Sequence, residues 1–476
     1  MKKPALIAHL VIVIAIAAGG LLHAQDYNLP DLGEESHQIM SPAEQKRLGE
    51  GFYRQARQYM DLLADPELND YIQTLGRKLV VSGGLPANSF TFFLIDDNMV
   101  NAFAVPGGYI GVNTGLILTA RNEAELASVL GHEIVHVKQQ HIPRMYSEQK
   151  RASLVNMATL LAGLLIGGQA TEAAIAVTSA QSQANQLTYT RLFEREADRL
   201  GIGILANAGY DTNAMPVFFN RMQQATRIYD SDVPEFLRSH PVTTDRIAEA
   251  KARAADYPPA SPNDESMFRH MKAKIRAHDL EPEDAIKHFH NNLQDNTDSM
   301  ADRYGLTYAL IGADQYEAAA RETRILLDND SDNPLYLILQ AHLELKLGSA
   351  DKALAHYRAL YDEYPDSYAV NTYYAQALLT SNKPAEARQL LRKATRKFPL
   401  DTNFYQLLAQ AEEQYGNKAD SHRANAEYYY LFGEYTAAIQ QLKIALSLTD
   451  KDNFYVQSSI SARMKAIRLE QKLATQ

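Results

Sequence analysis

Residues 126–141, LASVLGHEIVHVKQQH, contain the pattern H-E-x-x-H at His132, Glu133 and His136. On a helix, residues four apart lie about 40° apart around the axis and roughly 6 Å along it, so both imidazoles can face one ion. Glu133 falls between them, where a carboxylate can take a proton from a water on that ion. The pattern predicts a catalytic site with one Zn²⁺ per chain; the alternative is the polar face of an ordinary helix.

Two imidazoles do not complete a catalytic zinc site, so a third protein ligand is needed. One known arrangement places a histidine ten residues after the first, with a glycine at the seventh position. Ile142 and Gln139 occupy those places here, which excludes that arrangement. His141 is one residue out of register, and we expect it to be a surface histidine.

A carboxylate from further along the chain is the other choice for the third ligand. FEREAD, residues 193–198, offers Glu194, Glu196 and Asp198 on a predicted helix. Glu194 and Asp198 are four apart and share a face, whereas Glu196 points elsewhere. Glu194 can bind the metal while Asp198, behind it, accepts a hydrogen bond from the N–H of a ligand imidazole. A solvated acidic stretch paired with nearby arginines remains the alternative at this point.

Helices and a small sheet are predicted around these residues. Residues 42–82 have the caps and composition of two helices, and residues 89–97 those of a strand. A hairpin is predicted over residues 101–117, with its turn at 106–108. From Asn122 the apolar residues recur with a helical period. They are Ala124, Leu126, Ala127, Leu130, Ile134 and Val137.

The N-terminus has the layout of a secretory signal. Lys2 and Lys3 precede an uncharged apolar run over residues 10–22, and Ala24 ends a stretch of small residues. The run is too short for a bilayer span, which takes about 20 residues. We therefore expect cleavage after Ala24 and a mature chain outside the cytoplasm, with a retained membrane anchor as the alternative. Residues 152–180 form a second apolar segment, predicted as a helical hairpin. It is either a pair of buried or partner-packed helices, or a mobile lid or membrane-contacting hairpin.

The composition excludes other classes of function. The chain of 476 residues has no cysteine, so it forms no disulfide, thiolate metal site or cysteine nucleophile. Its net charge of −10 gives no reason to expect nucleic-acid binding.

A repeat with a period of 34 residues fills the C-terminal half, after a proline-rich linker near residues 258–262. Three ladders of small or turn-forming residues define it: Ala319, Ala353 and Ala387; Ala341, Ala375 and Ala409; Gly348, Asn382 and Gly416. The period and the aromatic residues between the ladders resemble tetratricopeptide repeats. The tyrosines Tyr357, Tyr361, Tyr364, Tyr373 and Tyr374 are expected either to pack between helices or to line a binding surface.

Taken together, H-E-x-x-H, then E-x-x-A-D about sixty residues later, then SHPVTTDRI resemble the M48 family of zinc metallopeptidases over residues 42–256. With a signal sequence and repeats, the whole chain resembles the periplasmic members that assist β-barrel assembly in Gram-negative bacteria. The resemblance implies His132, His136 and Glu194 as zinc ligands and Glu133 as general base. It also implies that Asn101, Ala102 and Phe103 lie in an edge strand that holds an extended substrate.

His240, in the SHP motif, carries a further expectation from the same resemblance. In the family this histidine sits close to the metal, where it can fill the fourth position and keep the enzyme latent. We expect His240 to be a removable plug or a transition-state donor, with Arg246 orienting its loop or binding a substrate carbonyl. The alternative for His240 is a turn histidine that caps the next helix.

These expectations define an α+β protein: a mostly helical zincin-like domain with a small sheet, then an all-α repeat solenoid. The predicted boundaries are a signal peptide at 1–24, a peptidase at 25–257, a linker at 258–265 and repeats at 266–476. The expected function is a periplasmic zinc endopeptidase, with chaperone activity, for unfolded or misassembled outer-membrane proteins. Its repeats would dock on the outer-membrane assembly machinery. The alternative is a non-proteolytic chaperone or scaffold with a structural zinc site.

Overall fold

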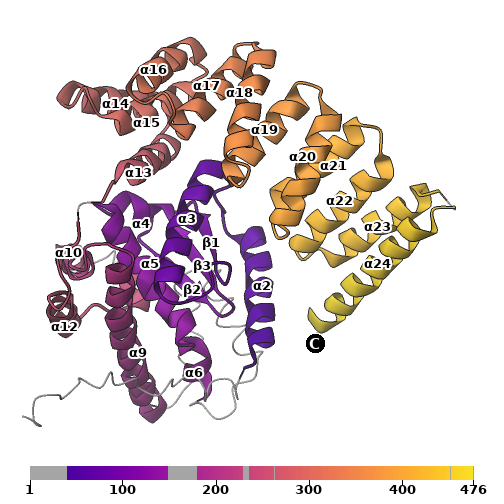
Figure 1. The fold of residues 1–476 in the computed structure, drawn as a ribbon. Helices are drawn as coiled ribbons and strands as arrows, with labels where there is room; N and C mark the ends of the chain where they lie inside the picture. The colour runs from indigo at the N-terminus through magenta and orange to yellow at the C-terminus, as the bar shows by residue number, and fades with distance from the viewer. Residues whose placement is uncertain (1–39, 148–179, 229–234, 262, 451, 475–476) are drawn as a thin grey trace, which may run out of the picture.

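The computed structural model of the chain describes residues 40–147, 180–228, 235–261, 263–450 and 452–474. Its N-terminal part surrounds a three-stranded sheet with helices, and its C-terminal part is an array of helices (Figure 1). The predicted fold class, α+β followed by an all-α solenoid, is confirmed. The predicted signal peptide lies outside the described residues, as does the predicted apolar hairpin except for its last residue.

Two capped helices open the described chain. Helix α2 (Pro42–Tyr59) begins with a capping box, in which Ser41 and Glu44 bond each other's main-chain amides. Asp65 caps helix α3 (Pro66–Ser82), and its carboxylate accepts hydrogen bonds from the main-chain amides of Glu67 and Leu68. Both helices begin where the caps in the sequence predict, and both pack against the sheet.

The sheet places its shortest strand at one edge. Strands β1 (Thr91–Ile95) and β3 (Tyr109–Asn113) pair in parallel, and β2 (Ala102–Val105) pairs antiparallel to β3, giving the order β1-β3-β2. The predicted hairpin between β2 and β3 is confirmed. At its turn Gly108 has φ 88°, and a Cβ there would lie 2.2 Å from the carbonyl oxygen of Ser89. Only glycine fits that turn. Strand β2 forms an edge of the sheet and lies beside helix α5.

Helix α5 (Glu123–Lys138) is buried on all sides over most of its length, between the sheet, α3, α9 (Ala180–Asn207) and α10 (Ala214–Ile228). It starts at Asn122, whose side chain accepts from the amide of Glu125. Gly131 and Gly201 let α5 and α9 approach closely, because a Cβ on Gly201 would lie 3.3 Å from the amide nitrogen of His132. The sequence predicts one apolar face, whereas in the structure the helix is buried on every side from Ala124 to Val135.

The repeat region consists of helices that pack in antiparallel pairs. Ala319, Ala353 and Ala387 are fully buried, so these ladder positions allow helices to approach closely, as predicted. The third ladder marks chain reversals: Gly348, Asn382 and Gly416 all have φ between 55° and 88°. The helices are α13 (Ser266–Asp279), α14 (Pro282–Asp295), α15 (Met300–Gly312), α16 (Tyr316–Asn329), α17 (Pro334–Lys346), α18 (Ala350–Glu363), α19 (Tyr368–Thr380), α20 (Pro384–Lys397), α21 (Thr402–Gln414), α22 (Lys418–Leu431), α23 (Tyr435–Leu448) and α24 (Phe454–Ala474).

The tyrosines of the middle repeats pack between helices. Tyr357 and Tyr374 are buried in one cluster, with ring centroids 6.4 Å apart. Tyr361, Tyr364 and Tyr373 are partly buried against the same cluster. Of the two expectations for these residues, packing between helices is the one that the structure supports.

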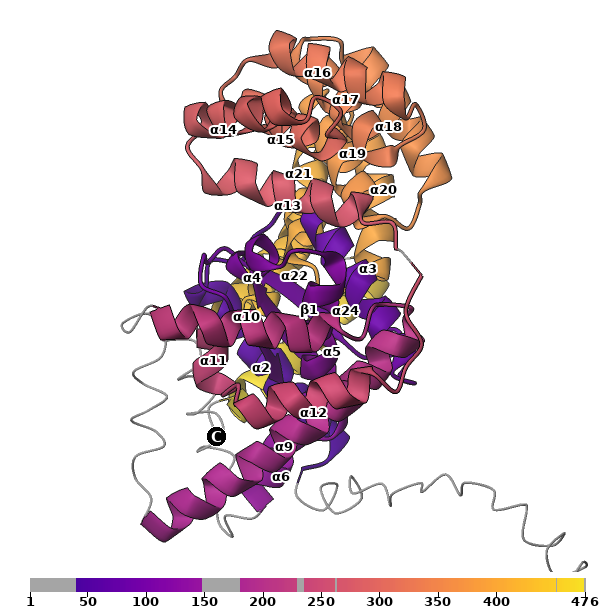
Figure 2. The ribbon, with the colours of Figure 1, turned by 90° about the vertical axis from the view of Figure 1, so that its left-hand side faces the viewer.

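The repeat array arches around the N-terminal part and touches it at several places (Figures 1 and 2). Asp70 of α3 accepts hydrogen bonds from the main-chain amides of Tyr368 and Ala369, both 3.0 Å, at the start of α19. At the far end, Arg54 of α2 donates to the hydroxyls of Tyr430 and Tyr435, both 3.2 Å. The repeats are therefore anchored to the N-terminal part near the middle of the array and near its C-terminal end.

A buried ion pair forms a third anchor. The Lys274 ammonium, on α13, lies 2.6 Å from Glu67 and 2.8 Å from Asp65. Tyr304 and Tyr308 donate their hydroxyls to Glu67 as well. This cluster joins the start of α3 to the first repeat helices.

Replacing Lys274 with methionine should lower the free energy of unfolding by about 3–5 kcal/mol, because Glu67 would remain buried without its cation. Chemical denaturation measures this change. The control is Arg253→Ala, which breaks an exposed pair with Asp256 and should change stability by less than about 0.5 kcal/mol. Equal losses in the two variants would contradict the structural role of the Lys274 pair.

Candidate metal centre

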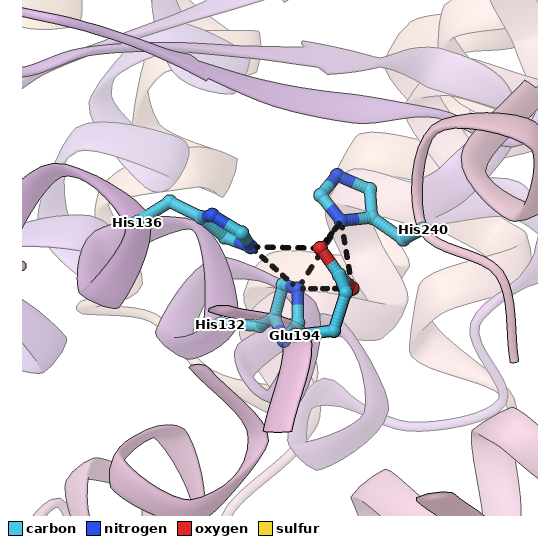
Figure 3. A group of neighbouring side chains, drawn as sticks. All are labelled: His132, His136, Glu194 and His240. Atoms are coloured by element: carbon cyan, nitrogen blue, oxygen red, sulfur yellow. Dashed lines mark hydrogen bonds and ion pairs between the residues drawn. The ribbon is translucent and has the colours of Figure 1, made fainter. Parts of the chain in front are cut away.

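Three parts of the chain bring four side chains to one point (Figure 3). His132 and His136 come from adjacent turns of α5, and Glu194 comes from α9. His240 follows α11 (Glu235–Ser239) and precedes α12 (Thr244–Ala254). One donor atom from each side chain lies within 4.8 Å of all the others. The sequence-predicted metal ligands are therefore neighbours in space.

The distances between these donors suit a shared cation. Nε2 of His132 lies 2.9 Å from Nε2 of His136 and 3.3 Å from Nδ1 of His240. Glu194 Oε1 lies 2.9 Å from His240 Nδ1 and 3.4 Å from His136 Nε2. Ligands about 2.0–2.1 Å from a tetrahedral zinc ion are about 3.3 Å apart. A single imidazole nitrogen cannot satisfy so many neighbours with one proton, so this donor set fits a metal ion.

His132 is held in place by a buried chain of charged groups. Its Nδ1 lies 2.9 Å from Asp198 Oδ1, so the N–H at that atom donates to the carboxylate and Nε2 is left free for a metal. Arg246 holds Asp198 with two hydrogen bonds, 2.7 and 2.8 Å long. It also contacts Glu194 Oε2 at 2.9 Å. Asp198 thus has the geometry of the predicted outer-sphere acceptor.

Arg246 also fixes the segment that carries His240. Its Nη1 donates to the carbonyl oxygen of Pro241, 2.8 Å away, and its side chain is buried. Of its two expected roles, orienting this loop is the one that matches these contacts. Helix α12 is capped by the Thr243 hydroxyl rather than by His240, so the alternative of a capping histidine is wrong.

His141 corrects the sequence interpretation. It was expected at the surface, but its side chain is only 3% exposed, and its Nδ1 lies 3.0 Å from Nδ1 of His136. Glu196 points away from the metal donors, as expected, and contacts His141 Nε2 at 3.3 Å. No clear sequence signal marks this position, because the residue that turns the chain, Gln140 with φ 53°, is neither glycine nor asparagine.

Glu133 lies beside the four donors and is almost fully buried. Its carboxylate accepts a hydrogen bond from the main chain of Ala104 in the edge strand. Within the described part of the chain, its Oε1 has no hydrogen-bond partner, and Nε2 of His240 lies 3.4 Å away. A buried carboxylate with an unused oxygen next to a metal site can accept a proton from water.

The charges of the site favour metal binding. Burial disfavours an ionised Glu194, but His240 and His132 outweigh it and hold the pKa of that carboxyl well below its usual range. Burial and the neighbouring His132 lower the pKa of His136 well below its usual value. Burial also opposes protonation of His132, yet Asp198 and Glu194 raise its pKa to about 10. Metal binding would therefore displace a proton from His132.

The edge strand, which the family resemblance associates with substrate binding, borders the site. Ala102 and Phe103 lie in β2, and Asn101 immediately precedes it. The Phe103 ring packs against Phe52 and Phe93, so the strand's main chain, not this ring, faces the site. A small pocket next to the metal donors is lined by Gln45, Ala104, Val105, His136, Ile142 and Pro143.

Cleavage of a peptide bond needs a polarised carbonyl, an activated water and a place for an extended chain. The convergent donors, Glu133 and the edge strand meet these needs, so the fold and site define a metallopeptidase. Comparison with known proteins is consistent with this class. Peptidase family M48 matches residues 66–254, and a tetratricopeptide repeat family matches residues 344–411.

Full-length relatives extend the similarity beyond the peptidase part. The β-barrel assembly-enhancing protease of Yersinia pestis is 32% identical over 98% of this chain and 94% of its own length. The protein of that name in Escherichia coli K12 is 31% identical over 88% of this chain and 87% of its own length. A mitochondrial metalloendopeptidase, OMA1 of Bos taurus, is 30% identical over 33% of this chain. The chain belongs to peptidase family M48, which confirms the resemblance described above.

Proposed function

We propose that this metallopeptidase is a zinc endopeptidase of the periplasm that acts on unfolded or misassembled outer-membrane β-barrel proteins. The observation that carries the zinc assignment is the convergence of three imidazoles and one carboxylate beside a buried glutamate. The substrate class rests on similarity to the relatives named above, which align with nearly the whole chain.

The proposed roles follow from the contacts. His132, His136 and Glu194 are the ligands that hold the zinc, and Asp198 fixes the ring of His132 through Nδ1. When bound, a zinc ion lowers the pKa of a water molecule and polarises a carbonyl group. Glu133 accepts the proton of the attacking water at its unused oxygen and returns it to the leaving amine.

His240 keeps the resting enzyme latent in this proposal. With its Nδ1 among the donors, four protein atoms would be available to a bound zinc ion, whereas a catalytic zinc site keeps one position open. Its other nitrogen, Nε2, faces the carboxylate of Glu133. His240 thus obstructs both the metal and the base, and activity requires that its loop move away.

The edge strand is the proposed docking site for the substrate main chain. Asn101, Ala102 and Phe103 lie where an extended segment can add to the sheet by hydrogen bonds.

The division of the chain supports delivery of substrate by the repeats. We place the peptidase at 25–257, a linker at 258–265 and the repeats at 266–476, after a signal peptide at 1–24. The repeats would hold unfolded outer-membrane proteins, as a chaperone does, or dock on the β-barrel assembly machinery. Within the described ranges, no helix has the length and apolarity needed to cross a bilayer.

The closed donor set also supports a second candidate function. A zinc ion held by four protein ligands is typical of structural sites, so the chain could act as a scaffold or chaperone without proteolysis. The buried Glu133 favours the enzyme, because a structural site has no use for a base at that position.

Metal removal tests the proposed function. The mature chain should carry one zinc ion, measured by elemental analysis, and should cleave casein or an unfolded outer-membrane protein. Treatment with a chelator should reduce cleavage to background, and added zinc should restore it, because both carbonyl polarisation and water activation depend on the ion. A folded chain that carries no zinc under zinc-replete conditions would refute the proposal.

A further inference from the structure

The second metal-ligand histidine has a support that the sequence did not indicate. We propose that His141 is a positioning residue that fixes the ring of His136 and links it to the carboxylate of Glu196. The inference rests on the proposed function, in that His136 must be a metal ligand. It adds a fourth histidine to the site without making that histidine a metal ligand.

The hydrogen-bond directions are determined by the chemistry of imidazole. If His136 gives the lone pair of Nε2 to a metal, its proton must be on Nδ1. That N–H points at Nδ1 of His141, 3.0 Å away, which must then be the acceptor. The proton of His141 is consequently on Nε2, from which it donates to Glu196 Oε2 at 3.3 Å. One set of tautomers satisfies the whole relay.

The surrounding structure holds His141 in this orientation. Helix α5 ends at Lys138, and α6 (His141–Ser147) begins after the left-handed residue Gln140. The His141 ring stacks on Phe193 of α9, with centroids 4.6 Å apart and planes 15° apart. The far end of the relay is also tied down, because Arg144 donates to Glu196 Oε2 at 3.1 Å.

The two ligand histidines of α5 therefore have matching supports. His132 donates directly to Asp198, which Arg246 holds, whereas His136 reaches Glu196 through His141. Both carboxylates come from α9, the helix that also carries Glu194. Groups that orient a ligand imidazole typically raise metal affinity by about 10- to 100-fold.

Zinc affinity, rather than catalysis, is the direct test. In a Glu133→Gln background, zinc binding is measured by competition with a chromogenic chelator. Adding His141→Phe keeps a ring to stack on Phe193 but removes both hydrogen bonds, so affinity should fall about 10- to 100-fold. Adding His141→Asn places an amide oxygen where Nδ1 was and should restore most of the loss.

The matched control is His270→Phe in the same background. His270 is another buried histidine with two hydrogen bonds, to the Ser266 carbonyl and the Tyr336 hydroxyl, both 2.7 Å, and it lies far from the metal donors in the repeat region. Its loss should reduce stability and leave zinc affinity unchanged. Glu196→Ala is a second test of the relay, and the fold should tolerate it because the Glu196 side chain is 20% exposed. Its zinc affinity should fall by less than that of His141→Phe.

The outcomes separate this inference from the proposed function. If the Glu133→Gln chain binds zinc tightly and His141→Phe binds it equally well, the relay is refuted while the zinc site stands. If His141→Asn and His141→Phe weaken zinc binding equally, the loss comes from altered packing and not from the missing acceptor at Nδ1. The relay is then also refuted. If the Glu133→Gln chain binds no zinc, both proposals are refuted.

Discussion

Glu133→Gln should reduce kcat/KM for protein cleavage by about 10²- to 10⁴-fold, the usual contribution of a general base. Glutamine keeps the size of the side chain and an oxygen to accept the hydrogen bond from the main chain of Ala104. It cannot accept a proton from water at neutral pH. The metal donors are untouched, so zinc content should be the same as in the wild type. Burial raises the pKa of Glu133, which makes it a stronger base for this step.

Glu125→Gln is the matched control for this variant. Glu125 lies two turns earlier on the same helix and is equally buried, but it pairs with Arg221 and the amide of Arg121 rather than facing the metal donors. Its substitution should reduce stability while leaving kcat per folded molecule intact. If Glu133→Gln instead cleared a misfolded outer-membrane protein as fast as the wild type, peptidase chemistry would be irrelevant to that role and the scaffold function would be favoured.

His240→Ala should have the opposite effect and raise cleavage by the resting enzyme. The substitution removes Nδ1 from the donor set and Nε2 from the neighbourhood of Glu133, while His132, His136 and Glu194 remain to hold the metal. If the plug stabilises the resting state by about 1–3 kcal/mol, as coupling free energies typically do, the cleavage rate rises about 5- to 150-fold. Initial rates on an unfolded substrate, at equal zinc content, measure the change.

Two comparisons make the His240 result interpretable. The double variant His240→Ala, Glu133→Gln should be inactive, which would show that the gained activity uses the same base. A His240→Ala chain with full zinc content and slower cleavage than the wild type would contradict the plug. That outcome would instead support His240 as a donor to the transition state.

The local parts of the site could be predicted because they depend on helical geometry. His132, Glu133 and His136 occur within five residues of one helix, so their relative positions follow from its period. Spacing also singled out Glu194 and Asp198 as a pair that shares a face, apart from Glu196. The approach of α9 to α5 depends on packing between distant segments, which no local pattern encodes.

His141 shows where such reasoning fails. Counting along a continuous helix places it out of register with the ligands and on the surface. In the structure α5 ends at Lys138, and Gln140 adopts a left-handed conformation. Glycine or asparagine at that position would have indicated such a conformation more clearly. A single backbone angle therefore turned a predicted surface residue into a neighbour of His136.

The repeats were more predictable than the site, because each unit repeats one set of contacts. The ladder of Gly348, Asn382 and Gly416 marks positions of positive φ, and the structure adds Asp314, with φ 56°, one period earlier. The sequence does not distinguish Asp314 as a position of positive φ, because aspartate is also common in ordinary turns. The anchors between repeats and peptidase were not predictable, since Lys274 and Glu67 are 207 residues apart.

The glycine contact between α5 and α9 determines how tolerant the donor set is to change elsewhere. Gly131 and Gly201 bring main chain against main chain, so the gap between the helices that carry His132 and Glu194 is set by backbone atoms. Backbone atoms have no alternative rotamers and no soft packing to rearrange. Exchanges of apolar side chains in the surrounding core should consequently cost stability before they disturb the spacing of His132 and Glu194. A methyl group at Gly201 should do the reverse and widen that spacing directly.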